Sequence, residues 1–255
     1  MARLDGGIRA LRSWSAAAAS SSGVDGDGRC SGVALVEDVL AVLGELLELP
    51  QAAAAVHRGA AADCERALDG FLVLADAYGT FESALLALKQ GAAELRAGAR
   101  RGDGAMVTAA LRAHRRTERE LCRLAAAMRH VVRRTPAAAS ATRPANDTDR
   151  EVIDIVAEAA AVTAAASVAI FLRCVALSRD LPAMVQTVSS NKWLARLGVT
   201  RAAKKAGSPE KAPAPALERL EELEECTGEM ESGSEKVFRR LLQTRVLLLN
   251  IHNPL

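Results

Sequence analysis

The sequence predicts an all-α fold, an elongated antiparallel helical bundle of about five to six helices with a disordered N-terminus and flexible linkers. Hydrophobic residues make up 50% of the 255 residues, whereas aromatic residues make up only 3%. The apolar material is therefore chiefly Ala, Leu and Val, and Ala and Leu have the high helix propensity that suits closely packed helices. Apolar residues also recur at steps of three and four, which is typical of amphipathic helices.

Residues 1–30 are expected to be disordered, and residues 31–255 are expected to form a single helical-bundle domain. The first segment is rich in Ala, Ser, Gly and Arg, and it offers little beyond Trp14 that could form a packed face. Such a composition favours disorder. Organelle transit peptides share this composition, although the acidic residues Asp5 and Asp25 argue against that alternative because transit peptides are poor in acids.

The cysteines indicate a reducing compartment. The five thiols are spread through the chain without a CxxC pair, so we expect buried, reduced side chains rather than metal ligands. No secretory signal is apparent at the start of the sequence. We therefore expect an intracellular, cytoplasmic protein, with the membrane periphery or the plastid as alternative locations.

Three helices are predicted in the first hundred residues. The first begins at Ser31, which can act as an N-cap, and ends before Pro50. Its apolar face consists of Val33, Val36, Leu40, Leu43 and Leu47. The next two cover about residues 51–77 and 80–100, and we expect them to be separated around Gly79 because glycine commonly ends a helix.

An arginine-rich helix is predicted over about residues 105–134, between a turn at Gly102 to Gly104 and Pro136. It carries eight arginines and two glutamates, whereas residues 217–235 carry eight glutamates and one arginine. Because opposite charges attract, we expect these two segments to lie side by side.

Phosphate binding is an alternative role for the arginine-rich helix, since guanidinium groups bind phosphate in a bidentate manner. The helix contains no aromatic residue that could stack on a base, and the formal charge of the whole chain is only +2. We therefore expect no nucleic acid partner. Internal pairing or a protein partner is preferred, and a membrane surface remains an alternative.

A linker near residues 135–149 leads into a helix that begins at Asp147 or Thr148 and ends near Leu177. Residues 159–172 within it carry no charge. At a rise of about 1.5 Å per residue they span only about 21 Å, less than the roughly 30 Å hydrocarbon core of a bilayer. We interpret this stretch as a central core helix, with a membrane-associated helix as the alternative.

A short amphipathic segment at 191–199 and a second linker near 200–215 precede the last helix, which begins near Ala216. The apolar residues of this helix follow mostly three- and four-residue steps, as in a coiled coil. Gly228 and Gly233 are expected to interrupt it, which favours packing inside one bundle over a long free-standing dimer.

The common catalytic and cofactor-binding motifs are absent. The sequence contains no GxGxxG after a strand, no GxxxxGK[ST], no GxSxG and no HExxH. Its four histidines are not spaced as zinc ligands, and we expect them on helix surfaces: His57, His114, His130 and His252. We therefore expect a protein that is not an enzyme and that needs neither a cofactor nor a metal ion.

Four stretches resemble a known plant family. The most specific is the string GSEKVFRRLLQTRVLLLNI from Gly233 to Ile251, which follows a glutamate-rich helix. The others are LRSW at 11–14, ELLELP at 45–50 and the long string at 67–101. In these stretches the chain resembles the plant BYPASS-related proteins, a family of unknown biochemical activity.

This resemblance implies an intracellular plant protein linked to root and shoot development, and it supplies no catalytic residues. We expect a non-enzymatic helical scaffold or regulatory interaction protein, for which the sequence identifies neither the protein partner nor the oligomeric state. The alternative is a peripheral membrane-associated protein that uses the apolar helix at 152–177 or the basic helix at 105–134. The candidate partner-binding surface consists of polar side chains and one aromatic ring on the last helix: Phe238, Arg239, Arg240, Thr244, Arg245 and Asn250.

Overall fold

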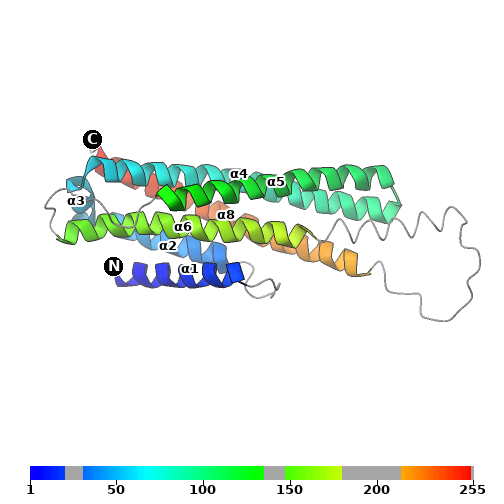
Figure 1. The fold of residues 1–255 in the computed structure, drawn as a ribbon, viewed down its shortest axis with the longest axis horizontal. Coiled ribbons are helices and arrows are strands. Elements are labelled where there is room, and N and C mark those ends of the chain that lie inside the picture. Colours follow the sequence, from blue (N-terminus) through cyan, green and yellow to red (C-terminus); the bar gives the residue numbers. More distant parts are fainter. Residues whose placement is uncertain (21–30, 135–146, 180–213, 254–255) are drawn as a thin grey trace, which may run out of the picture.

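The described part of the chain is entirely helical. The computed structural model describes residues 1–20, 31–134, 147–179 and 214–253, and these contain seven helices and no strand. The helices are α1 (Ala2–Ser20), α2 (Ser31–Leu47), α3 (Pro50–Arg58), α4 (Ala61–Arg101), α5 (Gly104–Arg134), α6 (Asp147–Arg179) and α8 (Ala214–His252). The longer ones run side by side (Figure 1). The all-α prediction is confirmed.

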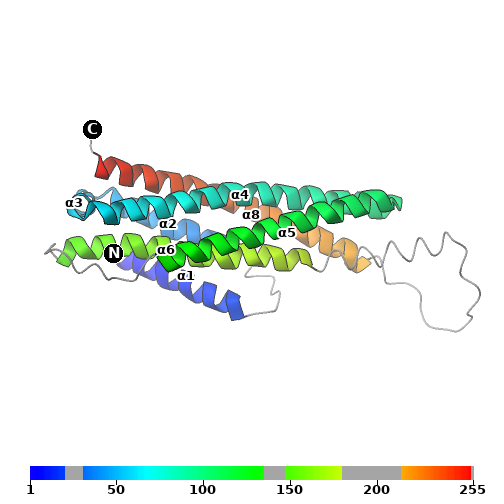
Figure 2. The same ribbon diagram turned by 45° about the horizontal axis from the view of Figure 1, so that its top comes forward.

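The N-terminal segment is helical where disorder was expected. In α1, Leu4, Ile8 and Leu11 lie at four- and three-residue steps and are buried. The helix α1 packs against α2 and α6, and ion pairs to both helices flank the buried face. Figure 2 shows α1 beside α6. The prediction of disorder over residues 1–30 is therefore wrong for α1, because three apolar residues on one face, together with the partly buried Trp14, anchor the helix to the core.

Pro50 begins a helix instead of only ending one. The preceding helix, α2, ends at Leu47 as predicted, and Pro50 occupies the first turn of α3, where its missing N–H group costs no hydrogen bond. The short α3 ends before Gly59, so the helix predicted over residues 51–77 is divided between α3 and α4.

The predicted break around Gly79 is wrong, because α4 continues through it. Thr80 does not cap a new helix, since its hydroxyl donates to the Asp76 carbonyl oxygen at 3.0 Å within α4. Tyr78, which precedes Gly79, is completely buried, and this burial raises the pKa of its hydroxyl. A helical glycine costs about 1 kcal/mol relative to alanine, whereas burying a large apolar side chain contributes about 1.5–3 kcal/mol.

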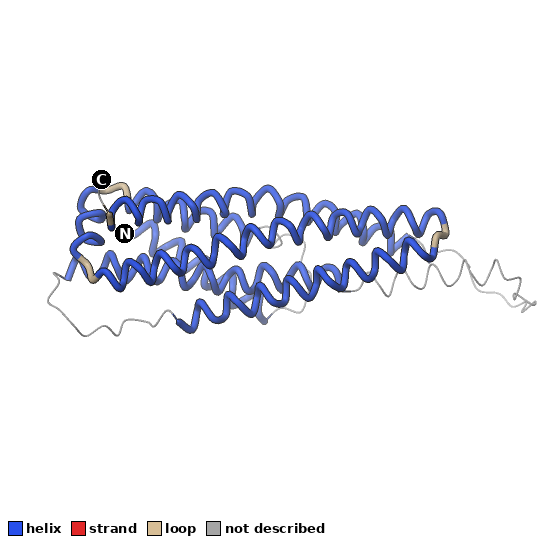
Figure 3. The backbone as a smooth tube through the Cα atoms, turned by 90° about the horizontal axis from the view of Figure 1, so that it is seen from above, coloured by secondary structure: helices blue, strands red, loops and turns tan. Residues whose placement is uncertain are grey.

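The predicted turn between α4 and α5 is confirmed. Gly102 adopts the left-handed conformation with φ 70°, which favours glycine, and its N–H donates to the carbonyl of Gly98. Asp103 then caps α5, since its Oδ1 accepts hydrogen bonds at 3.0 Å from the N–H groups of Ala105 and Met106. Seen from above, this loop lies at the end of the molecule opposite the described C-terminus (Figure 3).

The later helices match their predicted positions, and α8 is longer and less broken than expected. The predicted start of α6 at Asp147 is confirmed. Gly233 does not interrupt α8, and neither does Gly228. A β-carbon at Gly233 would lie 2.8 Å from a methyl carbon of Val33, so this glycine allows α8 to approach α2 closely. The segment 191–199 and most of the two predicted linkers lie outside the described residues.

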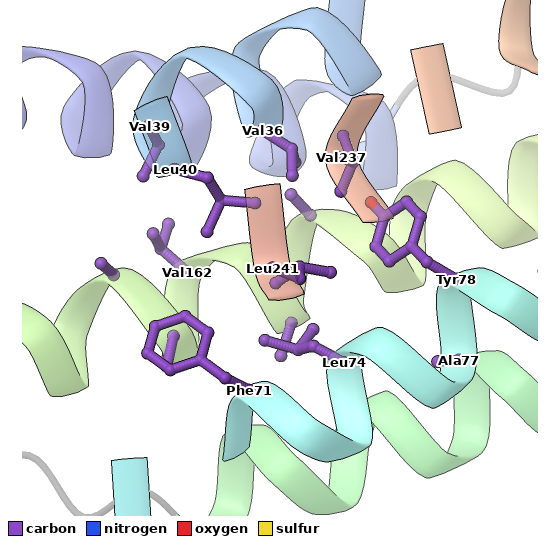
Figure 4. Packing of buried hydrophobic residues seen from close by; sticks show 14 of the residues in the cluster. Val36, Val39, Leu40, Phe71, Leu74, Ala77, Tyr78, Val162, Val237 and Leu241 are labelled. Atoms are coloured by element: carbon purple, nitrogen blue, oxygen red, sulfur yellow. The ribbon is translucent and has the colours of Figure 1, made fainter. Parts of the chain in front are cut away.

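The core is one cluster of buried apolar side chains. The side chains labelled in Figure 4 belong to this cluster and come from α2 (Val36, Val39 and Leu40), α4 (Phe71, Leu74, Ala77 and Tyr78), α6 (Val162) and α8 (Val237 and Leu241). In the C-terminal third of α6, the Phe171 ring lies 4.6 Å from that of Phe81 and 5.7 Å from that of Tyr78, measured between centroids. The uncharged stretch of α6 therefore supplies core contacts.

Two helical stretches, Ala61–Gly98 and Asp149–Ala176, are long and apolar enough to cross a membrane when judged by length and composition alone. In α6, 61% of the apolar window is buried inside the protein, and in α4 the share is 50%. This burial favours the interpretation of residues 159–172 as a core helix, because the core helix of a soluble protein has the same composition.

An ion pair joins α3 to the start of α6. Arg58 donates two hydrogen bonds to the Asp149 carboxylate, at 2.6 and 2.9 Å, and the Asp149 side chain is only 8% exposed. Hydrogen bonding by the guanidinium holds the pKa of Asp149 below its ordinary value. Nearby, the His57 ring lies 3.0 Å from the carbonyl oxygen of Ile251. The short α3 thus connects both α6 and the end of α8.

Candidate interaction surfaces

The acidic part of α8 lies against α4, and not against the arginine-rich helix. Glu224 contacts Arg96 at 2.5 Å, and Glu231 contacts Lys89 at 3.0 Å, so the two helices run antiparallel. α5 packs mainly on α4 and α6, whereas α8 packs mainly on α4 and α2. The predicted pairing of residues 105–134 with residues 217–235 is therefore wrong.

The same α4–α8 contact brings the carboxylate of Glu82 close to two other carboxylates. Glu82 on α4 lies near Glu235 and Glu231 of α8, and it is half-buried. Burial raises the pKa of Glu82, and the two neighbouring carboxylates raise it further, while Arg239 opposes this shift. The acidic segment is thus partly neutralised by cations of α4 and partly left with negative charges close together.

The described arginine side chains of α5 are exposed. Seven exposed residues of this helix form a surface that we call the basic face: Arg112, Arg115, Arg116, Arg119, Arg123, His130 and Arg133. Arg123 pairs with Glu120 of its own helix at 2.9 Å. No carboxylate of the described residues pairs with Arg112, Arg115, Arg116 or Arg119. The opposite side of α5 carries the buried residues, so the helix is strongly amphipathic.

The six residues of the predicted partner-binding surface do not share one face. Thr244 is buried, and Phe238 is half-buried against the core. Arg245 is also half-buried. The three exposed residues are Arg239, which pairs with Glu235, Arg240, which donates to Gln243 at 3.2 Å, and Asn250.

The structure adds apolar residues to this surface that the sequence analysis missed. Three apolar side chains form what we call the α8 stripe: Leu242, Val246 and Leu249, which are 40%, 53% and 37% exposed. They lie at four- and three-residue steps and so share one side of the helix. The opposite side carries Val237, Leu241 and Leu248, which are buried. A second apolar period within LLQTRVLLLNI was the signal that could have revealed the stripe.

The His, Cys, Asp and Glu side chains of the described residues do not cluster into a metal site. Among the described residues no group of three or more His, Cys, Asp or Glu side chains could hold a metal ion. Three of the described cysteines are buried, but Cys122 is exposed, so the expected burial is wrong for this thiol. His114 is also placed differently from the expectation, since it is buried on α5 with Nε2 3.8 Å from Glu118.

The fold and these two faces define a helical protein that presents a basic surface on one helix and an apolar stripe on another. The chain belongs to the family described as Protein BPS1, whose model matches residues 32–251. The resemblance to the BYPASS-related family is thereby confirmed, and family membership supports a plant protein related to development, of unknown biochemical function. No curated protein sequence and no solved structure matches the chain.

Proposed function

We propose that this protein is a non-enzymatic, intracellular scaffold or regulatory interaction protein that binds a protein partner through the outer side of α8. The observation that carries the proposal is the α8 stripe, in which three large apolar side chains of one helix face are exposed together. Neighbouring exposed apolar side chains on one face are typical of protein–protein contacts.

The stripe lies on a helix that is firmly held. On its inner side α8 buries Val237, Leu241 and Leu248 against α4 and α2. A binding surface on a packed helix loses little conformational entropy when a partner binds, which favours affinity. The outer side of α8 is therefore preorganised for docking.

Charge indicates what kind of partner would fit. Residues 236–253 contain four Lys or Arg residues and no acidic residue. Arg239, Arg240 and Asn250 are exposed on this part of the helix and provide the polar rim that surrounds an apolar contact. The matching partner is an amphipathic helix whose apolar residues recur at three- and four-residue steps and whose flanks are acidic. We also propose that this contact acts in root and shoot development.

Proximity labelling in plant root cells tests the α8 surface. The test variant carries Leu242→Asp, Val246→Asp and Leu249→Asp. Each apolar side chain buried at an interface contributes about 1.5–3 kcal/mol, so partner affinity should fall at least about a hundredfold, and a defined set of neighbours should disappear. The fold should remain intact by circular dichroism, because these side chains are already exposed.

The matched control carries Leu49→Asp, Val73→Asp and Leu86→Asp, three apolar residues of similar exposure elsewhere on the molecule. This variant should keep the neighbour set of the wild type. An unchanged neighbour set in the α8 variant, or an equal loss in the control, would refute the proposed surface.

A further inference from the structure

We propose that the basic face of α5 binds the phosphate groups of an anionic phospholipid surface. This second surface is independent of the α8 stripe in both position and chemistry. The proposal uses the basic helix and not the apolar helix at 152–177, since most of that helix's apolar window is buried.

Because α8 packs on α4 and α2, the described side chains of α8 supply no counter-charge to the basic face, in which Arg123 pairs with Glu120 of its own helix. Two glutamates of α8 pair with α4, Glu231 with Lys89 and Glu224 with Arg96. Four arginines of the basic face have no carboxylate partner among the described residues. Like charges three or four residues apart on a helix repel one another. Fold stability therefore does not explain the concentration of arginines, whereas an external anion does.

The shape of the basic face suits an extended flat surface. From Arg112 to Arg133 it covers about 32 Å along the helix, at about 1.5 Å per residue. The other exposed residues on this side include Ala109, Ala126 and Ala127, whose side chains are too short to hold a surface away from the guanidinium groups. α5 packs on α4 and α6 only with its inner side, so the arginines can approach one plane together.

The composition of the face favours lipid over other anionic ligands. Proteins that bind single-stranded nucleic acid stack bases on aromatic rings, and residues 104–134 contain no Phe, Tyr or Trp. A protein interface has an apolar centre, and the exposed residues between these arginines are mainly alanine. An array of phospholipid headgroups needs only phosphate-binding cations, and guanidinium groups bind phosphate in a bidentate manner.

Co-sedimentation with vesicles tests the proposal on the full chain. The wild type should pellet with phosphatidylcholine vesicles that contain phosphatidylserine and should stay in solution with phosphatidylcholine alone. A variant with Arg112→Gln, Arg116→Gln, Arg119→Gln and Arg123→Gln should bind at least about a hundredfold more weakly, since each basic residue near an anionic surface strengthens binding about fivefold. Binding should weaken as salt is added, and soluble inorganic phosphate should not replace the vesicles.

A control variant with Arg3→Gln, Arg9→Gln, Arg12→Gln and Arg66→Gln has the same change in net charge at exposed residues outside both surfaces and should bind like the wild type. The proposal is overturned if the wild type ignores the anionic vesicles or if the control loses as much binding as the test variant. It is also overturned if the basic face binds duplex RNA in preference to vesicles. A clear fall in melting temperature for the α5 variant would assign these arginines to internal pairing, which also contradicts the proposal.

Discussion

Replacing Phe171 with alanine should lower the free energy of unfolding by about 3–5 kcal/mol, the usual cost of removing a buried aromatic side chain. Phe171 is completely buried, and its ring contacts those of Tyr78 and Phe81 from α4. The substitution removes these ring contacts and leaves a cavity between α6 and α4. Urea denaturation followed by circular dichroism measures the loss.

Leu86→Ala provides the control for that measurement, because Leu86 is exposed and lies on α4 itself. Its effect should stay within about 0.5 kcal/mol. If Phe171→Ala also changed stability by less than about 1 kcal/mol, α6 would not be a core helix. The uncharged residues 159–172 would then need another explanation, such as insertion into a membrane.

Replacing Leu11 with alanine should cost about 2–5 kcal/mol, although this residue lies in a segment whose composition suggests disorder. Leu11 is completely buried where α1 meets α2 and α6. Urea denaturation again gives the free energy. Arg9→Ala is the control, because Arg9 is exposed on the same helix and should have little effect. Equal stability of wild type and Leu11→Ala would mean that α1 is not part of the core.

The helices that the sequence predicts well are those with a regular apolar period and clear ends. Ser31 marks the start of α2, and Gly102 with Asp103 separates α4 from α5. Errors arise where one residue type was given more weight than the period. Gly79 was taken as a helix end, yet Tyr78 and Phe81 continue the buried face of α4 across it. For α1, the prediction likewise relied on composition and overlooked the short apolar face of Leu4, Ile8 and Leu11.

The position of the acidic segment could not be predicted from charge alone. Net charge favours the arginine-rich helix as its neighbour, but helices choose neighbours by burying their apolar sides, and exposed ion pairs contribute only about 0–1 kcal/mol each. Lys89 and Arg96 of α4 each lie opposite a glutamate of α8. Apolar burial therefore determines that α8 packs on α4, and Lys89 and Arg96 add ion pairs to this contact.

Of the candidate residues on α8, the sequence pattern alone does not reveal which are exposed, and the reason is helical geometry. Successive residues turn by about 100°, so polar residues that are close in sequence do not share a face. Thr244 consequently points into the core, while Arg240 and Asn250 are exposed. The apolar residues Leu242, Val246 and Leu249 of the same segment are exposed, because they lie on the opposite side of the helix from Val237, Leu241 and Leu248.

Glu224 and Glu231 of α8 pair with α4 and not with α5, and we propose that this leaves the basic face available to an external ligand. Zero-length carbodiimide cross-linking followed by mass spectrometry tests it directly, since this reagent joins an amine only to a carboxylate that it contacts. In a variant carrying Arg116→Lys and Arg119→Lys, we predict a link between Lys89 and Glu231, which lie 3.0 Å apart. We predict no link from positions 116 or 119 to the glutamates of residues 217–235. Links from those two positions, without the link from Lys89, would contradict the claim.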